Sequence, residues 1–248
     1  GAASGIGASV AAVLAAAGAD VVLADRDSKG LAGTAENIAQ FDRQAVSSIV
    51  DVRSRDEVEE LGRLVVAQFG RLDVWVNVAG ILRRSAIVDT SQSDLDDILD
   101  VNLKGTYWGC ATAARIMMPA GRGSIINFAS AGGEMPAPEL SVYSLTKAAV
   151  IMLTRTLAVE AGPSGVRANA VSPGFTDTPM VSGPFARADG SIDEAQRDEV
   201  YARRAEQAAL RMIAEPMDIA LTVQYLASDA SRFVTGQNLR VNGGVHMA

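Results

Sequence analysis

The sequence predicts one α/β domain built on a doubly wound parallel sheet, and three observations predict it. Short apolar runs that suit buried strands alternate along the chain with longer segments that suit helices. Several of the expected strands are followed directly by aspartate, asparagine, glycine or serine, and ligand contacts of such sheets lie at the carboxyl ends of the strands. The 248 residues accommodate one large domain, and no linker-like stretch divides them.

Composition narrows the function classes. The formal net charge of −7, without a Lys/Arg cluster, weighs against a nucleic-acid surface. Cys110 is the single cysteine and His246 the single histidine, so neither an intrachain disulfide nor a His/Cys metal site is expected. The apolar runs are broken by Gly, Asp or Arg, so we expect no membrane partner and a cytoplasmic location.

The chain opens with a glycine-rich turn. Gly1, Gly5 and Gly7 precede an Ala-rich stretch that predicts a helix ending near Gly18. Such a turn lets the backbone approach a pyrophosphate while the helix N-terminus faces the negative charge, although tight packing alone also explains it. A strand should lead into this turn, so we expect roughly ten further residues upstream that form it.

An acidic residue ends the next expected strand. The run VVLA at 21–24 fits a buried parallel strand that leads into Asp25, about twenty residues beyond the glycine turn. A carboxylate there accepts hydrogen bonds from the adenosine ribose and repels a 2′-phosphate, which predicts NAD rather than NADP. Arg26 could partly offset that repulsion, but a solvated loop charge is the simpler interpretation.

The alternation continues with a helix near 28–40, a strand at 45–50, a charged helix from 56 to 70 and a strand at 72–77. Asp51 and Val52 follow the first of these strands, and Asp51 could meet the adenine amino group. The turn of residues 77–80 could let the backbone pass close to the cofactor. Taken alone, each position is more readily explained as an ordinary cap or turn.

Residues 91–118 read as one long helical segment that carries Asn102. Gly105 follows three residues later, which suggests a local kink whose freed carbonyls could hold water. A surface asparagine is the alternative. A strand at 123–130 then delivers Ser130, and a helix over 142–161 carries Tyr143 and Lys147 on one face.

Tyr143 and Lys147 are four residues apart, so the ammonium should lie beside the phenol. At about 5 Å and an effective dielectric near 20, their attraction is on the order of 3 kcal/mol. That attraction would lower the pKa of the phenol by about two units and suit it to proton transfer. Ser130 could hydrogen-bond the same substrate oxygen. A solvated pair formed by chance is the alternative.

The last third of the chain supplies a turn and an expected lid. A strand at 166–172 ends in a turn from Pro173 to Pro179, whose hydroxyls and free amides suit a carboxamide. Residues 180–214 are charged and flanked by Pro and Gly, which indicates a lid over the site or a solvated insertion. A capped helix and a short strand at 237–241 follow.

With these residues in hand, the chain resembles the short-chain dehydrogenase/reductase (SDR) family along its whole length. The glycine turn is similar to the family's TGxxxGxG from its first glycine onward, without the threonine. NxAG at 77, the Ser130, Tyr143 and Lys147 set, PG at 173 and the terminal VNGG recur in the family's order and spacing. Val78 and Asn242 depart from the pattern, which usually has asparagine and aspartate there.

The resemblance implies a three-layer α/β/α Rossmann-type fold with a seven-stranded sheet in the order 3-2-1-4-5-6-7, the first strand being missing here. It also implies roles for four catalytic residues. Tyr143 would be the general acid/base, Ser130 would orient the substrate oxygen, Lys147 would lower the tyrosine pKa and bind the nicotinamide ribose, and Asn102 would hold a water linking Lys147 to solvent.

Cofactor contacts and assembly are implied in the same way. A homotetramer is expected, with the helices around 92–118 and 142–161 at its interface. The expected NAD contacts are Gly1, Ser4, Gly5, Ile6, Asp25, Arg26, Asp51, Val52, Asn77, Ala79, Gly80, Tyr143, Lys147, Pro173, Gly174, Phe175, Thr176 and Thr178.

The predicted function is the NAD(H)-dependent interconversion of a secondary alcohol and a ketone. One alternative is an NADPH-dependent reductase of 3-oxoacyl thioesters of the acyl-carrier-protein type, which Asp25 disfavours. A second is a non-catalytic dinucleotide-sensing protein, which could dispense with Tyr143. A small or medium hydrophobic substrate is expected, because the residues expected to face it are mostly small or apolar. They are Ile81, Leu82, Gly132, Gly133, Pro136, Met180 and Phe185, and Glu134 is the polar exception.

Overall fold

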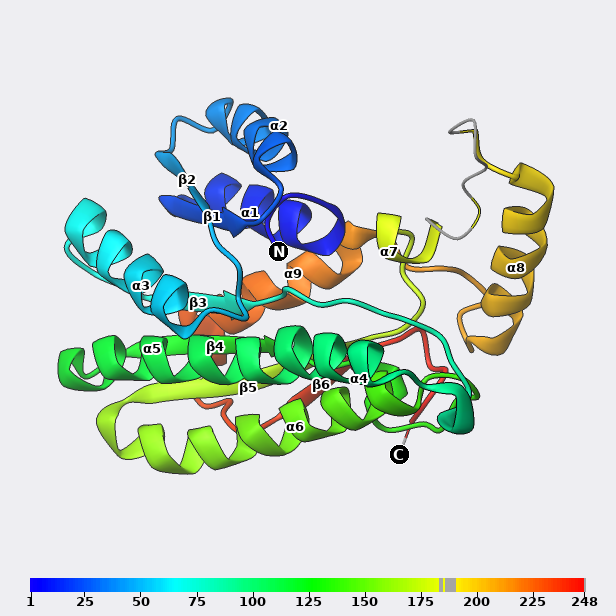
Figure 1. The fold of residues 1–248 in the computed structure, drawn as a ribbon. Coiled ribbons are helices and arrows are strands. Elements are labelled where there is room, and N and C mark those ends of the chain that lie inside the picture. The colour runs from blue at the N-terminus through cyan, green and yellow to red at the C-terminus, as the bar shows by residue number, and fades with distance from the viewer. Residues whose placement is uncertain (183–184, 186–190, 248) are drawn as a thin grey trace.

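The computed structural model describes residues 1–182, 185 and 191–247. Parallel strands form the central layer, and helices cover both of its faces (Figure 1). The predicted doubly wound α/β domain is therefore confirmed. The strands are β1 (Val21–Asp25), β2 (Ala45–Ile49), β3 (Val74–Asn77), β4 (Gly123–Phe128), β5 (Val166–Pro173) and β6 (Asn238–Val241). The helices are α1 (Gly5–Ala16), α2 (Ser28–Ala39), α3 (Arg55–Phe69), α4 (Gln92–Ile98), α5 (Thr106–Ala120), α6 (Ser141–Ala161), α7 (Pro179–Ser182), α8 (Glu194–Gln207) and α9 (Pro216–Ala227).

The strands form two parallel groups. β1 pairs with β2, and β3, β4, β5 and β6 pair in that order. Within the described residues, β1 and β3 face each other across a slot of about 650 Å³ without pairing. This arrangement matches the expected order with its first strand absent. The extra strand would belong in this slot, where it would pair the facing edges, and it stays a prediction.

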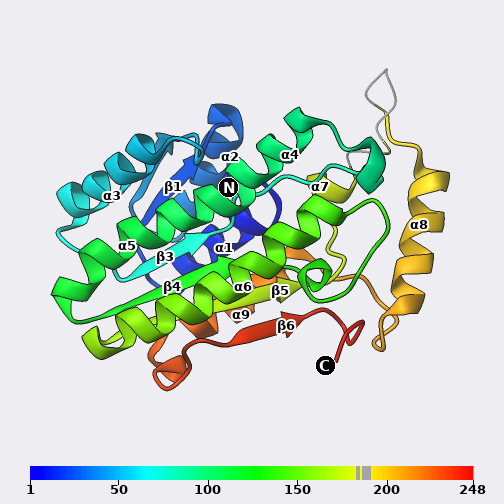
Figure 2. The same ribbon diagram turned by 60° about the horizontal axis from the view of Figure 1, so that its bottom comes forward.

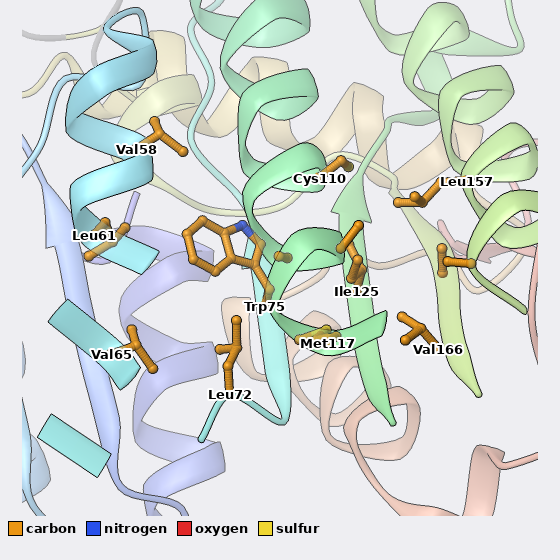
Figure 3. Close-up of a cluster of buried hydrophobic side chains, with 14 of the residues drawn as sticks. Val58, Leu61, Val65, Leu72, Trp75, Cys110, Met117, Ile125, Leu157 and Val166 are labelled. Carbon is orange, nitrogen blue, oxygen red and sulfur yellow. The ribbon is translucent and has the colours of Figure 1, made fainter. Parts of the chain in front are cut away.

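A large apolar cluster fixes the central strands to the helices of one face. Trp75, Met117, Ile125 and Val166 lie within it beneath α3, α5 and α6, as Figure 3 shows. Each large side chain that leaves water on folding contributes roughly 1.5–3 kcal/mol. This packing holds β3 and β4 in place, and Ala79, Gly80 and Ser130 of the expected site follow shortly after those two strands.

Helix α3 shows how the sequence sets an element of this layer. Ser54 caps its first turn by accepting a hydrogen bond from the Glu57 amide, and Gly70 ends it in the left-handed conformation at φ 70°. Val58, Leu61 and Val65 recur at helical spacing and are buried against the cluster.

The expected helical run over 91–118 is present, and it is disturbed at Asn102. Helix α4 passes through a π-helical turn (Leu99–Gly105) into α5 without a break. The Thr106 hydroxyl donates to the Asn102 carbonyl at 2.8 Å, so one carbonyl at the irregular turn is satisfied by a side chain. The predicted local distortion is therefore confirmed, and it turns Asn102 into the protein interior.

All strands run parallel, so their carboxyl ends meet at one end of the sheet. Figures 1 and 2 both place α7 and α8 beyond this end, where a lid was expected. Part of the expected lid, residues 183–184 and 186–190, lies outside the described residues. Helix α6 is long and apolar enough to span a membrane by composition, but its buried face packs on β4 and β5 as a core helix does.

Candidate active site

A cleft of about 1090 Å³ opens at the carboxyl ends of the strands and gathers most of the predicted site residues. It differs in kind from the slot between β1 and β3, because the backbone turns and polar side chains that follow the strands line it. The predicted residues on its wall are Gly1, Ser4, Gly5, Ile6, Asp25, Arg26, Asp51, Val52, Ala79, Gly80, Ser130, Tyr143, Lys147, Pro173, Gly174, Phe175, Thr176 and Thr178.

Lys147 is buried, with 4% of its surface exposed, and it is anchored to the sheet. Its Nζ donates a hydrogen bond of 2.8 Å to the Phe128 carbonyl at the end of β4. The same Nζ lies 5.7 Å from the centroid of the Tyr143 ring. One helix therefore brings both groups to the same point, as the four-residue spacing predicts, and the strand fixes where the cation sits.

The predicted direction of the Tyr143 pKa is wrong for the protein alone. Burial raises the pKa of Tyr143, and a hydrogen bond with Ser130 offsets this only in part. Burial likewise lowers the pKa of Lys147 to about 8. An effective dielectric near 20 describes a partly solvated Tyr143–Lys147 pair. In the folded protein both groups are buried, and desolvation disfavours both charged forms.

Ser130 follows β4 with an extended backbone and caps a short 3₁₀ turn (Ala131–Gly133). Its Oγ accepts a hydrogen bond of 3.1 Å from the Gly132 amide. A side chain at Gly132 would come within about 3.6 Å of both Ser130 and Tyr143, so a small residue there keeps the space above them open. The Ser130 hydroxyl is thereby aimed at the same region as the phenol.

Asn102 lies behind the cleft wall, fully buried, and grips the loop that follows β3. Its Oδ1 accepts from the Ile81 amide at 2.8 Å, and its Nδ2 donates to the Ile81 carbonyl at 2.9 Å. The Nδ2 also reaches the Thr146 hydroxyl at 3.4 Å, which links the loop to α6. These contacts make Asn102 a positioning residue, and its water relay stays a prediction.

The glycine turn suits a pyrophosphate. Helix α1 begins at Gly5, where φ is 52°, and the Ser4 side chain makes no cap hydrogen bond. No acidic residue lies in the first turn, so the N–H groups there face the cleft without an anionic partner. A side chain at Gly1 would come 2.7 Å from the Ala79 backbone nitrogen, so the turn packs directly on the end of β3. The free amides and close backbone fit a dinucleotide.

Carboxylates line the other end of the cleft. Asp25 accepts hydrogen bonds of 3.1 Å from the amides of Ala3 and Asp27, which fix its orientation beside the glycine turn. Asp51 is held by its own loop, with Arg53 donating to both carboxylate oxygens. Burial opposes ionisation of Asp51, but the hydrogen bonds from Arg53 dominate and lower its pKa. These groups suit the hydroxyls and amino group of an adenosine.

The turn after β5 closes the opposite side. The Thr176 hydroxyl donates to the Gly174 carbonyl at 3.2 Å, and the Thr178 hydroxyl donates to the Thr176 carbonyl at 3.4 Å. The Phe175 ring meets Tyr201 of α8 edge to face, with centroids 5.3 Å apart. The lid helix therefore packs directly on the turn that was expected to hold a carboxamide.

The structure places some expected residues away from the cleft. Asn77 does not line it, because its Nδ2 donates to Asn127 at 2.8 Å and its Oδ1 accepts from Trp75 at 2.7 Å. Gly133 packs on the Lys147 backbone, and a side chain there would come within 2.8 Å of it. Phe185 is buried against the Tyr201 ring, whereas Ile81, Leu82, Gly132, Pro136 and Met180 do line the cleft.

Glu134 also points elsewhere. Its Oε2 accepts from Asn238 at 2.9 Å, and both carboxylate oxygens accept from Arg240, so the loop after Ser130 is tied to the edge strand β6. Only 13% of the Glu134 side chain is exposed. The sequence predicts that Glu134 faces the substrate, but in the structure its carboxylate ties the loop after Ser130 to β6.

Several wall residues carry no sequence signal. Arg84 follows β3 in an unremarkable loop, and Arg204, Gln207, Leu210 and Met212 come from the charged lid, yet all five line the cleft. The lid composition indicates that its residues approach the site, but it does not say which ones. Their positions follow from how α8 packs on the turn at Phe175.

The fold and the grouping of Ser130, Tyr143 and Lys147 in one cleft are those of a nicotinamide-dependent oxidoreductase. The family described as Enoyl-(Acyl carrier protein) reductase matches residues 1–246, and the chain belongs to the short-chain dehydrogenase/reductase family.

Named relatives and solved structures extend this finding. The chain is 37% identical over 248 residues to the 3-oxoacyl-[acyl-carrier-protein] reductase FabG of Staphylococcus epidermidis, covering 100% of this chain and 97% of that protein. It is 38% identical over 244 residues to the short-chain reductase protein NovJ of Streptomyces niveus, covering 98% and 91%. The crystal structure of a levodione reductase superposes with a TM-score of 0.92 at 29% identity, covering 98% of this chain and 93% of that chain.

Proposed function

We propose that this protein reduces the 3-oxo group of an acyl thioester to a secondary alcohol, and catalyses the reverse reaction, with NAD(H) as its cofactor. The convergence of Tyr143, Lys147 and Ser130 on a cleft that also presents a dinucleotide-type glycine turn carries this proposal. The substrate class is supported by the FabG relatives, whose names specify a 3-oxoacyl thioester. It is a special case of the predicted ketone and secondary alcohol pair, so both interpretations share one mechanism.

The residues divide the chemistry of reduction among them. A bound nicotinamide would supply the hydride. Tyr143 donates its hydroxyl proton to the ketone oxygen, and its raised pKa keeps that proton in place at neutral pH. Ser130 donates a hydrogen bond that orients the same oxygen. The Lys147 ammonium, held by the Phe128 carbonyl, stabilises the phenolate that remains.

Asp25 supports NAD(H) as the cofactor. Its carboxylate lies beside the glycine turn at the end of β1, where it suits a ribose hydroxyl and repels a 2′-phosphate. Arg26 lines the same part of the cleft and opposes that repulsion. We propose that the carboxylate dominates, because the backbone hydrogen bonds of Ala3 and Asp27 hold it in place.

A free ketone or secondary alcohol is the second candidate substrate. It is favoured by the similarity to a levodione reductase and by the apolar wall that Ile81, Leu82, Pro136 and Met180 form. Such a substrate needs the same proton donor and hydride carrier. The two candidates differ only in what lies beyond the reacting carbonyl.

One experiment decides among these candidates. NADH and NADPH oxidation would be followed at saturating cofactor with acetoacetyl-CoA, methyl acetoacetate and a cyclic ketone. We expect the highest kcat/KM with NADH and acetoacetyl-CoA, and a kcat roughly 10²–10⁴-fold lower for Tyr143→Phe. Preference for the cyclic ketone would select the second candidate. Tight NADH binding without turnover of any substrate would instead indicate a dinucleotide-sensing protein.

We further propose a homotetramer that works in the cytoplasm and pairs through α5 and α6. Leu145, Met152 and Val159 recur every seven residues on α6, and each is more than half exposed. Tyr107 on α5 is half exposed as well. An apolar stripe of this kind suits packing against a second copy. Light scattering should show a tetramer for the protein and smaller species for Met152→Lys, with Lys29→Gln at an exposed position of α2 as the control.

A further inference from the structure

Arg84 and Arg204 come from different elements and both line the mouth of the cleft. They lie on the side away from the carboxylates of Asp25 and Asp51. Arg84 comes from the loop after β3, and Arg204 comes from the last turn of α8. The guanidinium of Arg204 stacks on the Phe175 ring at 5.6 Å from its centroid. Loop, lid and nicotinamide-side turn therefore meet where these cations lie.

Neither cation has a carboxylate partner among the residues that the structure describes. Arg204 donates only to the Gln207 side chain, at 3.1 Å, and its Nε is buried without a partner. Arg84 makes no hydrogen bond or ion pair within the described part of the chain. By contrast, the adjacent Arg83 pairs with Asp94 and Asp97.

The cleft offers no acid that could neutralise them. Asp25, Asp51 and Asp218 are the acidic residues on its wall. The first two lie at the adenosine end, and Asp218 accepts from the Glu215 amide in the cap of α9. Burial and the nearby charges of Arg84 and Arg203 lower the pKa of Arg204, so the cations crowd one another. A protein with a net charge of −7 thus keeps uncompensated positive charge beside its catalytic cleft.

We propose that Arg84 and Arg204 form an anion-binding subsite for the substrate, so that the ketone carries a carboxylate or phosphate beyond its reacting carbonyl. The subsite rests on the proposed ketone reduction, since it lies in the same cleft. Guanidinium groups bind both anions through planar paired hydrogen bonds, and Arg204 uses only one of its terminal nitrogens on the described protein, in the hydrogen bond to Gln207. Because Arg204 belongs to the lid helix, binding the anion would also draw the lid onto the substrate.

Three substrates with the same reacting carbonyl test the subsite. Methyl acetoacetate is neutral, acetoacetate carries a carboxylate, and acetoacetyl-CoA carries phosphates. We expect KM to be about tenfold lower for at least one anionic substrate than for the neutral ester. Arg84→Gln and Arg204→Gln should each lower kcat/KM for that substrate about tenfold, mainly by raising KM. The kcat/KM for the neutral ester should change by no more than about twofold.

The anionic substrate that benefits identifies the source of the charge. A KM lower than that of the neutral ester for acetoacetate alone indicates that the substrate is a free oxo acid. A lower KM for acetoacetyl-CoA alone indicates that the subsite binds the phosphate of a carrier arm. Arg203→Gln, which removes the same charge from an exposed neighbour outside the cleft wall, should leave all values unchanged. Equal losses for the neutral and anionic substrates would overturn the proposal.

Cofactor binding provides the second control. NADH affinity, measured by fluorescence titration, should be the same in both arginine variants as in the protein itself. A loss of NADH affinity would assign the arginines to the cofactor phosphates and overturn the substrate subsite.

Failure of the proposed function gives a different pattern. In that case NADH binds but none of the three substrates turns over. Calorimetry with acetoacetate and methyl acetoacetate on the NAD-bound protein then still tests the subsite. Tighter binding of the acid, lost in Arg84→Gln, would support it, and equal binding of acid and ester would reject it.

Discussion

The two ends of the cleft hold their functional side chains in opposite ways. At the proposed catalytic end, Lys147 and Asn102 are buried and bonded to backbone groups of distant segments. At the proposed adenosine end, Asp25, Arg26 and Asp51 lie on the cleft wall, and their loops or close neighbours hold them. Changing a residue at the adenosine end alters few other contacts, whereas changing a buried one disturbs several elements. The comparison therefore predicts a fixed chemistry and an adjustable cofactor choice.

The largest expected effect lies at the catalytic end. Tyr143→Phe removes the proton donor and should lower kcat by roughly 10²–10⁴-fold, the usual contribution of a general acid. NADH affinity should remain within about twofold, because the ring and its packing stay in place. Stopped-flow absorbance and fluorescence titration measure the two quantities. Substantial remaining turnover would mean that another group supplies the proton.

The buried lysine should set the pH dependence of reduction. With its pKa near 8, Lys147 is charged below pH 8 and loses its charge above it, while Tyr143 keeps its proton throughout because its pKa is raised. The kcat/KM for reduction should therefore be level below pH 8 and fall by about tenfold per unit above it. Lys147→Met should be slow and lack this break; a break that persists in the variant would assign it to another group.

The same lysine gives a stability test. Its pKa in the folded protein lies below the ordinary value of 10.5, so the unfolded chain binds the extra proton between about pH 8 and 10.5. The free energy of unfolding should therefore rise with pH across this window, by on the order of 3 kcal/mol in total. Denaturant titrations of the protein and of Lys147→Met would show the rise in the first and its absence in the second.

A smaller and more selective effect is expected at the adenosine end. Asp25→Asn removes the charge that repels a 2′-phosphate, so the NADPH to NADH ratio of kcat/KM should rise by about tenfold. The two amides donate to different carboxylate oxygens, so the single Oδ1 of the asparagine can keep only one of the hydrogen bonds from Ala3 and Asp27, and a stability loss of about 1 kcal/mol is expected beside the change in cofactor preference. Asp42→Asn removes the same charge at an exposed position outside the cleft and serves as the control. An unchanged ratio would show that Arg26 or the backbone decides the preference.

The smallest effect concerns the tether between Glu134 and Arg240. Either Glu134→Gln or Arg240→Gln should loosen the loop after Ser130 and raise substrate KM by about threefold, with kcat and NADH affinity nearly unchanged. The double variant should be little worse than either single one, because both act on one contact. Arg232→Gln, an exposed arginine before β6, is the control. Additive increases in substrate KM in the double variant would show that Glu134 and Arg240 act independently and not through one contact.

The sequence and the structure agree where local pattern decides. Short apolar runs mark β1, β3 and β4, and the glycines mark the start of α1, because these features depend on neighbouring residues. The grouping of Ser130, Tyr143 and Lys147 could also be predicted, since a strand end and one helical face fix it. The resemblance to the SDR family supplied the strand order.

What could not be predicted depends on long-range packing. Glu134 and Arg240 lie 106 positions apart, so no local pattern joins them. Asn77 turns toward Asn127 and not toward the cleft because a neighbouring strand offers an amide partner. The raised pKa of Tyr143 follows from burial, which the spacing of two residues does not reveal.

Deuterium transfer tests the central claim most directly. NADH that carries deuterium at both positions of carbon 4 of the nicotinamide would be mixed with acetoacetyl-CoA and the protein, and the product examined by mass spectrometry. We expect a 3-hydroxyacyl product that carries deuterium at carbon 3, and its formation roughly 10²–10⁴-fold more slowly by Tyr143→Phe, which still binds NADH. Unlabelled product, or labelled product formed equally fast by Tyr143→Phe, would contradict it.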